Sequence, residues 1–445
     1  MKRTITTLAL SLLTATAPVL AADTAASTAT APMAHVAWSH NANIYEVNIR
    51  QYTPEGSFEA FAQHLPRLKK MGVDILWLMP IHPIGKTNRK GKLGSYYAVR
   101  DYTAVNPEFG TMDDLRGLVK QAHALGMHVI IDWVANHTAF DNVWTLQHKD
   151  WYLRNPQGEI FPVTHASSGE VWADVAGLDW NNRALWKGMT DAMLFWVREA
   201  DIDGFRADVA GEVPVPFWNQ ARAALDRVKP VFMLAEADTP DMHEHAFDMT
   251  YGWDTKDIFK DIARGKADAR TLRTFLSKPS KTYPPGAYRM RFTSNHDENS
   301  WSGSDVELYG PAFKAMALLA ATLPGMPLIY GGQEAGLDKR IEFFEKDPIQ
   351  WKNYEYAPLY TDLLALKHAN RALWNGQYGA EAQPIDTGND KVFAFRRALP
   401  GNAVQVTVNL SGQAQRYTLA GGAEKNLEPW DFVIDVQQSK SQPRR

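Results

Sequence analysis

The chain of 445 residues contains no cysteine. It therefore has no disulfide, no thiolate metal site and no thiol nucleophile. A packed core must supply its stability, and a chain of this length can build one. Hydrophobic residues make up 45% of the sequence and charged residues 22%, which are the proportions of a globular protein.

The sequence also lacks an excess of charge of one sign. The 47 Lys and Arg residues against 50 Asp and Glu residues give a formal net charge of −3. Nothing in this balance favours nucleic acid or an anionic membrane surface as a partner.

Aromatic residues are plentiful, with 15 Trp, 16 Tyr and 19 Phe. We expect most of them in the core, but exposed rings would suit a sugar, whose apolar face stacks on them.

Long apolar runs are missing except at the N-terminus. There, two basic residues precede an apolar stretch over residues 5–20, and alanines follow it. This order predicts a signal peptide over residues 1–22, and the Thr and Ser within the stretch make a membrane anchor the weaker alternative. We expect a secreted or periplasmic protein with no membrane span and with a flexible lead-in over residues 23–40.

From residue 41 to residue 372, short β-rich segments alternate with amphipathic helical ones. Strands are predicted near residues 44–50, 73–79, 128–132, 204–207, 231–234, 247–250, 288–293 and 327–330. This alternation predicts an α/β fold with eight parallel strands in a (β/α)₈ TIM barrel. A doubly wound open sheet is the alternative, but it would need a glycine-rich fingerprint after the first strand, where Arg50-Gln-Tyr-Thr-Pro-Glu55 stands.

Other segments depart from the simple alternation or extend beyond it. Residues 57–71 show a single apolar helical face and predict one helix. A short loop-rich insertion is expected after the third strand, at about 138–180, because little periodicity is visible there. The pattern is all-β over 373–438, which predicts a C-terminal antiparallel β-sandwich domain, and a polar tail follows at 439–445.

Four short segments at predicted strand ends carry polar residues that a packed core would not choose. They are Asp132-Trp-Val-Ala-Asn136-His137, Gly204-Phe-Arg206-Ala-Asp208, Leu234-Ala-Glu236 and Asn295-His296-Asp297. In a barrel, the carboxylates of Asp208, Glu236 and Asp297 converge on one mouth, and their crowding raises at least one pKa. A carboxylic acid beside ionised carboxylates is what glycoside hydrolysis requires.

The same segments supply partners for these carboxylates. Arg206 stands two residues before Asp208 and therefore shares its strand face, where a guanidinium would hold the nucleophile ionised. His137 and His296 are placed to donate hydrogen bonds to sugar hydroxyls. Each segment alone also has a structural explanation, such as a salt-bridged strand, a helix cap or a packed histidine. The four together, in this order, favour catalysis.

With these motifs the chain resembles the α-amylase family, the retaining glycoside hydrolases of family 13 type built on a (β/α)₈ barrel. The resemblance extends from about Ile44 through the C-terminal sheet. It implies that Asp208 is the nucleophile of a glycosyl-enzyme intermediate and that Glu236 is the general acid and then base. Asp297 would bind the sugar hydroxyls and stabilise the transition state.

The resemblance also implies a sugar subsite on the non-reducing side of the cut. Arg206, His137 and His296 would complete it, and Tyr97 would stack under the same sugar. The neighbouring Tyr96 is an alternative for that position.

Two features depart from the family pattern. Members often have Lys and His soon after the nucleophile, where this chain has Gly211-Glu212; Glu212 either lines the leaving-group subsite or faces solvent. Many relatives bind a structural calcium ion, here through Asn136, but Gly177 stands where a carboxylate is usual, and a missing anionic ligand lowers affinity. The chemistry itself requires no cofactor.

The expected activity is hydrolysis of α-1,4-glucosidic bonds in starch, maltodextrins or cyclodextrins, so the partner is an oligo- or polysaccharide. A transglycosylase or an α-glucosidase acting on small α-glucosides is the alternative, and an inactive glucan-binding protein is remote because all three carboxylates are present. The sequence leaves the oligomeric state open. Five tryptophans are candidates for further glucose subsites or for ordinary packing: Trp133, Trp144, Trp172, Trp218 and Trp301.

Overall fold

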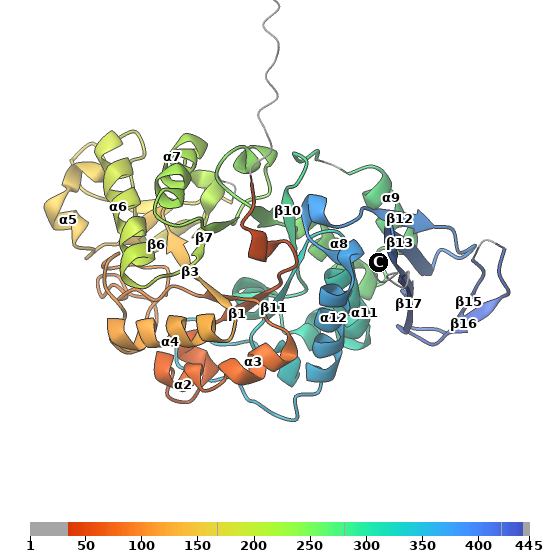
Figure 1. Ribbon diagram of the computed structural model, residues 1–445. Coiled ribbons are helices and arrows are strands. Elements are labelled where there is room, and N and C mark those ends of the chain that lie inside the picture. Colours follow the sequence, from red (N-terminus) through yellow and green to blue (C-terminus); the bar gives the residue numbers. More distant parts are fainter. Residues whose placement is uncertain (1–33, 167, 280, 420, 439–445) are drawn as a thin grey trace, which may run out of the picture. The chain divides into compact units, whose positions relative to one another are not determined.

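The computed structural model describes residues 34–166, 168–279, 281–419 and 421–438 (Figure 1). The predicted signal peptide, most of the predicted lead-in and the predicted tail lie outside the described residues. Within the described ranges, no helix has both the length and the apolar character needed to cross a bilayer.

Eight parallel strands close into a barrel in the order β1-β11-β10-β9-β8-β7-β3-β2. The strands are β1 (Ile44–Val47), β2 (Ile75–Leu78), β3 (His128–Val134), β7 (Gly204–Asp208), β8 (Phe232–Ala235), β9 (Met249–Tyr251), β10 (Tyr288–Arg291) and β11 (Met326–Tyr330). The predicted TIM barrel is confirmed, and each predicted strand falls on one of these eight strands.

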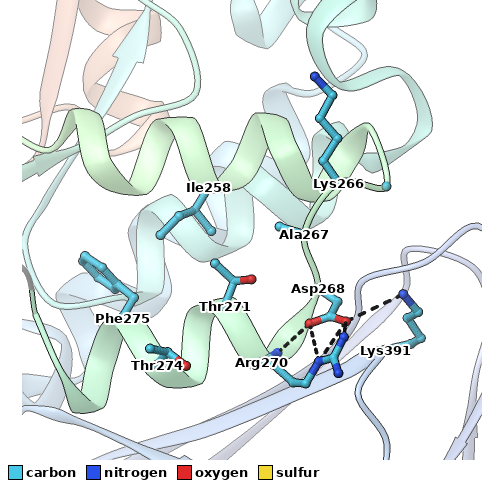
Figure 2. Close-up of a pocket in the computed structure, with 10 residues that line it drawn as sticks. Ile258, Lys266, Ala267, Asp268, Arg270, Thr271, Thr274, Phe275 and Lys391 are labelled. Atoms are coloured by element: carbon cyan, nitrogen blue, oxygen red, sulfur yellow. Dashed lines mark hydrogen bonds and ion pairs between the residues drawn. The ribbon is translucent and has the colours of Figure 1, made fainter.

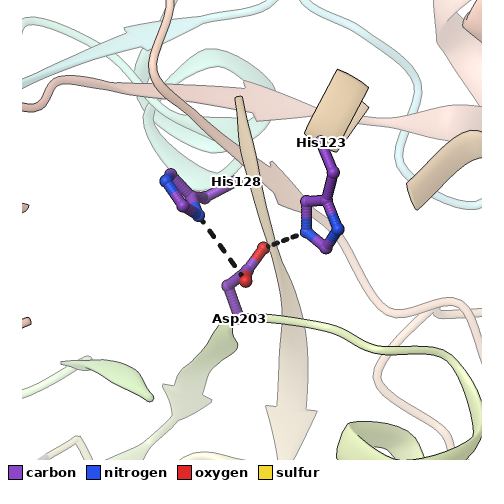
Figure 3. Close-up of side chains that lie close together, drawn as sticks. All are labelled: His123, His128 and Asp203. Carbon is purple, nitrogen blue, oxygen red and sulfur yellow. Dashed lines mark hydrogen bonds and ion pairs between the residues drawn. The ribbon is translucent and has the colours of Figure 1, made fainter. Parts of the chain in front are cut away.

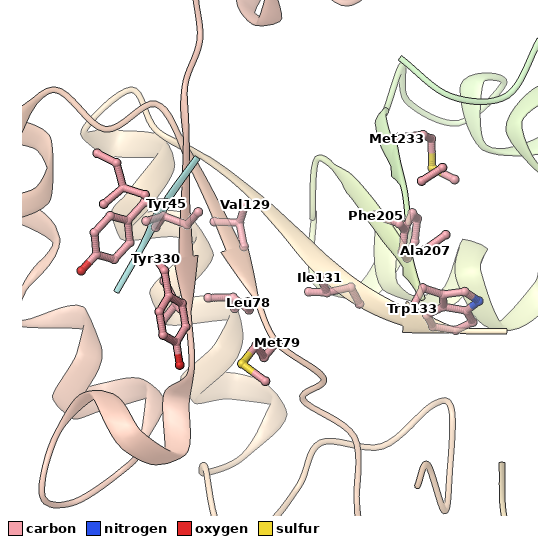
Figure 4. Close-up of a cluster of buried hydrophobic side chains, with 14 of the residues drawn as sticks. Tyr45, Leu78, Met79, Val129, Ile131, Trp133, Phe205, Ala207, Met233 and Tyr330 are labelled. Carbon is pink, nitrogen blue, oxygen red and sulfur yellow. The ribbon is translucent and has the colours of Figure 1, made fainter. Parts of the chain in front are cut away.

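The apolar residues of the barrel strands divide between two layers. Tyr45, Ile131 and Phe205 belong to the layer between the strands and the helices (Figure 4), whereas Ile44 and Ile130 belong to a second cluster inside the barrel. The strands are therefore buried on both faces, as parallel sheets require.

Gly204, at the start of β7, shows how closely two strands approach. Its φ is +153°, and a Cβ atom at this position would lie 1.8 Å from the Phe232 carbonyl oxygen of β8. Only glycine leaves room for this contact.

Helices connect the strands and cover the outside of the barrel (Figure 1). They are α1 (Ile49–Tyr52), α2 (Phe58–Ala62), α3 (Leu65–Met71), α4 (Met112–Ala124), α6 (Arg183–Glu199), α7 (Val215–Asp226), α8 (Trp253–Ala263), α9 (Ala269–Ser277), α10 (Asp305–Tyr309), α11 (Phe313–Thr322) and α12 (Ala357–Ala369). The prediction of one helix over 57–71 is wrong, because α2 and α3 are separate. Pro66 stands in the first turn of α3, has no N–H to continue a helix from α2, and so starts a new one.

The insertion after β3 contains more regular structure than the sequence indicated. It holds α5 (Trp144–Gln147) and a three-stranded antiparallel sheet of β4 (His137–Ala139), β6 (Val171–Gly177) and β5 (Pro162–Thr164), in that order. Two of these strands are only three residues long, too short to show a period of two. The register of β5 against β6 shifts between Pro162 and Val163, which marks a β-bulge.

The C-terminal part is antiparallel, as predicted. A four-stranded sheet has the order β12 (Ala382–Ile385), β13 (Val392–Leu399), β14 (Asn402–Asn409) and β17 (Phe432–Gln438). A two-stranded sheet, β15 (Gln415–Tyr417) and β16 (Lys425–Leu427), accompanies it.

Arg397 of β13 joins this sheet to the barrel. Its buried guanidinium donates hydrogen bonds to four backbone carbonyls, those of Thr322, Leu323, Trp374 and Ala380, over 2.7–3.2 Å. Thr322 is the last residue of α11, so the arginine satisfies carbonyls that the end of that helix leaves without partners. Burial lowers the pKa of the Arg397 guanidinium to about 9.

Replacing Arg397 by alanine should destabilise the protein by about 3 kcal/mol, because several buried carbonyls lose their donor together. The neighbouring Arg396 is exposed and donates to Gln437 across the sheet, so Arg396→Ala is the matched control and should cost less than about 0.5 kcal/mol. Thermal unfolding followed by circular dichroism measures both. Equal midpoints for the two variants would contradict the prediction.

Candidate active site

A cavity of about 880 Å³ opens at the carboxyl ends of the barrel strands. Asp208 is the last residue of β7, Glu236 follows β8, and Asp297 lies in the loop after β10. Six of the residues predicted for the site line this cavity: Tyr97, His137, Asp208, Glu236, His296 and Asp297.

Arg206, the seventh predicted residue, is completely buried beside the cavity and holds three carboxylates. Its Nη1 lies 2.8 Å from Asp132 Oδ1 and 2.9 Å from Asp208 Oδ1, and its Nη2 lies 3.0 Å from Glu236 Oε1. Asp132 and Arg206 stand opposite each other on the neighbouring strands β3 and β7. Although burial disfavours the charge, Asp132 and Glu236 keep the pKa of Arg206 well above its ordinary value.

The crowding of carboxylates has the predicted electrostatic effect. Burial raises the pKa of Asp208 well above its ordinary value, and Glu236 and Asp132 add to this rise while Arg206 opposes it. Burial also raises the pKa of Asp132, although the charge of Arg206 lowers it. Because such groups titrate together, the cluster retains a proton at higher pH than isolated carboxyl groups do.

A second chain of contacts crosses the other side of the cavity. His296 Nδ1 pairs with Glu46 Oε1 on β1, and its Nε2 lies 3.2 Å from Asp297 Oδ2. Burial lowers the pKa of His296, but the two carboxylates outweigh it and raise that pKa well above the ordinary value. Burial raises the pKa of Asp297, and the nearby His296 brings it below its ordinary value. The pair is therefore imidazolium and carboxylate at neutral pH.

Tyr97, rather than Tyr96, faces the cavity. The Tyr97 hydroxyl donates to Asp132 Oδ2 over 3.1 Å and lies 2.8 Å from His296 Nε2, so it links the two carboxylate groups. The Tyr96 hydroxyl instead accepts hydrogen bonds from Asn48 and Gln51 and does not line the cavity.

Sequence reasoning missed several residues that support the site. Glu46 fixes His296, Trp77 Nε1 donates to Asp132 Oδ2 over 3.1 Å, and the Tyr251 hydroxyl accepts from Arg206 Nε over 3.1 Å. A carboxylate inside the otherwise apolar stretch Ile44-Tyr-Glu-Val47 was a signal for Glu46. Asp132 stands in the first of the four motifs, and its role as a partner of Arg206 depends on a contact between two strands.

His137 lines the cavity as a neutral imidazole, because burial lowers its pKa to about 4.

Glu212 takes neither of the positions expected for it. Its Oε1 accepts a hydrogen bond from the Ala166 N–H over 2.8 Å and lies 3.4 Å from His165 Nε2. It therefore tethers the β5–β6 turn of the insertion to the loop that follows Asp208.

Two of the five tryptophans proposed for sugar contacts line the cavity, Trp172 and Trp301. Trp133 and Trp218 are completely buried, and Trp144 packs against the core. Phe343 and Phe344, from the loop after β11, also line the cavity and were not predicted.

The residues around Asn136 do not fit a calcium ion. A Cβ atom at Gly177 would lie 3.0 Å from Leu153 Cδ1 and 3.5 Å from a methyl of Val163, so an apolar contact occupies the place of the usual carboxylate. The Asp179 carboxylate accepts hydrogen bonds from Asn181 instead. Calcium takes six or more oxygen ligands, and this set does not supply them.

A histidine cluster lies at the opposite end of the barrel, where β3 and β7 begin (Figure 3). His123 Nε2 is 2.7 Å from Asp203 Oδ2, and His128 Nδ1 is 3.5 Å from Asp203 Oδ1. The spacing would allow a metal ion, but Lys229 Nζ already lies 2.9 Å from Asp203 Oδ1. An ammonium group at that distance repels a cation, so the cluster is an ion-pair network.

A shallower pocket of about 610 Å³ lies between α8, α9 and Lys391 (Figure 2). Asp268 accepts hydrogen bonds from the Arg270 backbone and guanidinium and lies 3.9 Å from Lys391 Nζ. Within this pocket, Asp268 is therefore paired with both Arg270 and Lys391.

The site lies at the carboxyl ends of the strands of a TIM barrel and consists of carboxylates around one buried arginine. This arrangement is typical of glycosidases. The family model described as "Alpha amylase, catalytic domain" matches residues 23–358. The chain belongs to the α-amylase family.

Individual relatives agree with this assignment. An α-amylase of Haloarcula japonica is 26% identical over 87% of the chain, and an α-1,4-glucan:maltose-1-phosphate maltosyltransferase of Rhodospirillum rubrum is 29% identical over 83%. The chain spans 58% and 57% of the length of these two proteins.

Two solved structures match this chain over nearly the whole of their own length. An α-amylase from Lactobacillus plantarum has a TM-score of 0.80 and 29% identity, covering 90% of this chain and 99% of its own. A maltogenic α-amylase from Thermotoga neapolitana has a TM-score of 0.78 and 31% identity, covering 89% and 96%.

The network at the amino ends of the strands should make stability depend on pH. The hydrogen bond to Asp203 raises the pKa of His123, so the folded protein binds this proton more tightly than the unfolded chain. The stabilisation is complete below about pH 6.5, the unfolded pKa, and is lost as pH rises through the folded value. His123→Gln should therefore destabilise the protein by about 0.5–1 kcal/mol more at about pH 5.5 than at about pH 9.

Thermal midpoints at the two pH values measure this difference. His245→Gln is the control, because His245 is exposed. The interpretation fails if the His123→Gln variant loses the same stability at both pH values.

Proposed function

We propose that the protein is a retaining hydrolase that cleaves α-1,4-glucosidic bonds in starch, maltodextrins or cyclodextrins. The observation that carries this proposal is the pair of carboxylates, Asp208 and Glu236, beside adjacent nitrogens of the buried Arg206 guanidinium at the cavity surface. A retaining enzyme needs two neighbouring carboxyl groups, one to attack the sugar directly and one to act on the leaving oxygen, and the shared guanidinium holds Asp208 and Glu236 beside each other in this way.

In this mechanism Asp208 attacks the anomeric carbon while Glu236 gives its proton to the glycosidic oxygen, and the bond from carbon to that oxygen breaks. A covalent glycosyl-enzyme results. The Glu236 carboxylate then takes a proton from water, whose oxygen displaces Asp208 from the same carbon. Two inversions leave the α-configuration unchanged, and each residue returns to its starting protonation state.

The surrounding groups match the needs of an oxocarbenium-like transition state. The ionised Asp297 stabilises developing positive charge and accepts hydrogen bonds from sugar hydroxyls. The His296 imidazolium is a donor only, and the neutral His137 offers one donor and one acceptor. Tyr97 supplies an aromatic face beside them.

Transfer to a second sugar is the main alternative, and several relatives carry the name of maltosyltransferases. The steps up to the glycosyl-enzyme are the same, so the outcome depends on whether water or an acceptor hydroxyl reaches it. Aromatic side chains at the cavity, such as Trp172, would hold an acceptor. Hydrolysis of small α-glucosides is a further variant of the same chemistry.

Incubation of the signal-free protein with soluble starch and a ladder of maltooligosaccharides tests the proposal. Shorter products whose α-anomers appear first support a retaining hydrolase. Products that are longer than the substrate, and whose amount increases when an acceptor sugar is added, would show that the protein is a transglycosylase. Absence of any reaction with either substrate contradicts an α-1,4-glucan enzyme.

Asp208→Asn should reduce turnover by on the order of 10³-fold or more, because the amide cannot form the glycosyl ester. Glucan binding should persist, since the shape of the cavity is retained. Asp238→Asn, which alters a carboxylate that pairs with Lys281 and does not line the cavity, is the control and should keep turnover within about twofold. Full turnover by Asp208→Asn would overturn the assignment of the nucleophile.

We also propose that the protein is exported to the periplasm or the medium. The support is the basic, apolar and small-residue order of residues 1–22. Expression of the full chain in a Gram-negative host, followed by fractionation and mass measurement, should give a mature species that lacks about 21–22 residues. A cytoplasmic protein of full mass would contradict export.

A further inference from the structure

The barrel order separates the two ends of a bound glucan. β8, which precedes Glu236, lies across the closed barrel from β1, and β1 is flanked by β2 and β11. Glu236 protonates the leaving oxygen in the proposed mechanism, so the reducing-side sugars depart over β8. The non-reducing part of the chain therefore extends toward the loops after β2 and β11, which carry Tyr97 and Phe343.

An ion pair connects two separate elements at this end of the cavity. Lys90, in the loop after β2, places its Nζ 2.9 Å from Oδ1 of Asp174, on β6 of the insertion. Both residues line the cavity. The Asp174 side chain is only 7% exposed, whereas that of Lys90 is 41% exposed, so the lysine reaches over from outside to a buried carboxylate.

Asp174 stands in the β-bulge of the insertion, which changes the direction of its side chain. The register between β5 and β6 passes from Val163 opposite Trp172 to Pro162 opposite Ala176, which leaves residues 173–175 of β6 without partners in β5. A bulge bends the strand and redirects its side chains. The bulge therefore accounts for a carboxylate at the cavity surface.

The segment that carries Lys90 is fixed on both sides. The Lys86 N–H donates to the Asp141 carboxylate of the insertion over 3.0 Å. On the other side, the Leu93 N–H donates to the Phe344 carbonyl over 3.1 Å, and the Lys92 N–H donates to Glu345 Oε1 over 2.9 Å. The loop after β2 is thus tied to the insertion and to the loop after β11, and the ion pair joins two parts of a continuous rim.

We propose that the Lys90–Asp174 ion pair closes the cavity on the non-reducing side, so that the enzyme acts on the non-reducing ends of α-glucan chains and releases short products. This inference rests on the proposed function, and it selects open-chain starch and maltodextrin ends over cyclodextrins, which have no ends. An ammonium and a carboxylate side by side also present a donor and an acceptor to the hydroxyls of a terminal glucose.

The test uses maltoheptaose labelled at its reducing end, once with a free non-reducing end and once with that end blocked by a 4,6-O-ethylidene group. The protein should cleave the free-ended substrate at least about tenfold faster than the blocked one, a discrimination on the scale that a steric clash or a lost hydrogen bond at the terminal sugar gives. On labelled substrates of increasing length, the labelled fragment should lengthen with the substrate, because the cut is counted from the free end.

Variants connect this preference to the ion pair. Lys90→Ala and Asp174→Asn should each bring the cleavage rates of the blocked and free substrates to within about threefold of each other, while Lys90→Arg, which can restore the contact, should keep the preference. Lys352→Ala is the matched control, since Lys352 forms an exposed pair with Asp338 at 3.0 Å outside this cavity.

Equal cleavage of both substrates by the unaltered protein would overturn the inference, and so would an unchanged preference in Lys90→Ala and Asp174→Asn. If a variant fails to fold, the comparison of the two substrates with the unaltered protein still decides. A failure of the proposed function is distinct, because then neither heptaoside nor starch is cleaved.

Discussion

The buried guanidinium of Arg206 is the interaction on which the rest of the active site depends. A charge without solvent is very costly unless opposite charges surround it, and removing one partner would leave the others uncompensated. Asp132, Asp208 and Glu236 each approach one of its nitrogens within 3.0 Å. The arrangement therefore holds residues from three adjacent strands, β3, β7 and β8, at fixed positions at the mouth of the barrel.

The remaining charges of the site are arranged around this group. One arginine cannot balance three carboxylates, and the excess negative charge favours retention of a proton within the cluster. Asp297 stays ionised beside His296, whose pKa is raised by Asp297 itself and by Glu46. The site thus divides into a part that exchanges a proton and a part that stays charged, as expected when carboxylates have different neighbours.

The sequence was sufficient for the barrel and for six of the residues that line the cavity at its mouth, because both follow from local patterns. Strand segments are visible as apolar runs, and the motif residues stand at or soon after the carboxyl ends of barrel strands. It was not sufficient where a contact joins distant segments, as for Glu46 with His296 or for Lys90 with Asp174. Two local features were also not predicted from the sequence. Pro66 separates two helices within an apparently continuous helical pattern. The three-residue strands of the insertion are too short to show a periodic pattern.

These distant contacts bear on specificity. The ties that hold the insertion to the barrel loops include Lys90 with Asp174, the Lys86 N–H with Asp141, and Glu212 with the Ala166 N–H. Asp208 and Arg206 stand on β7 and carry out the chemistry in the proposed mechanism, whereas these side-chain ties join the loops that border the cavity. Under the proposed function, substitutions at the ties should therefore change the choice of chain end without changing the carboxylates, because the two lie in different parts of the molecule.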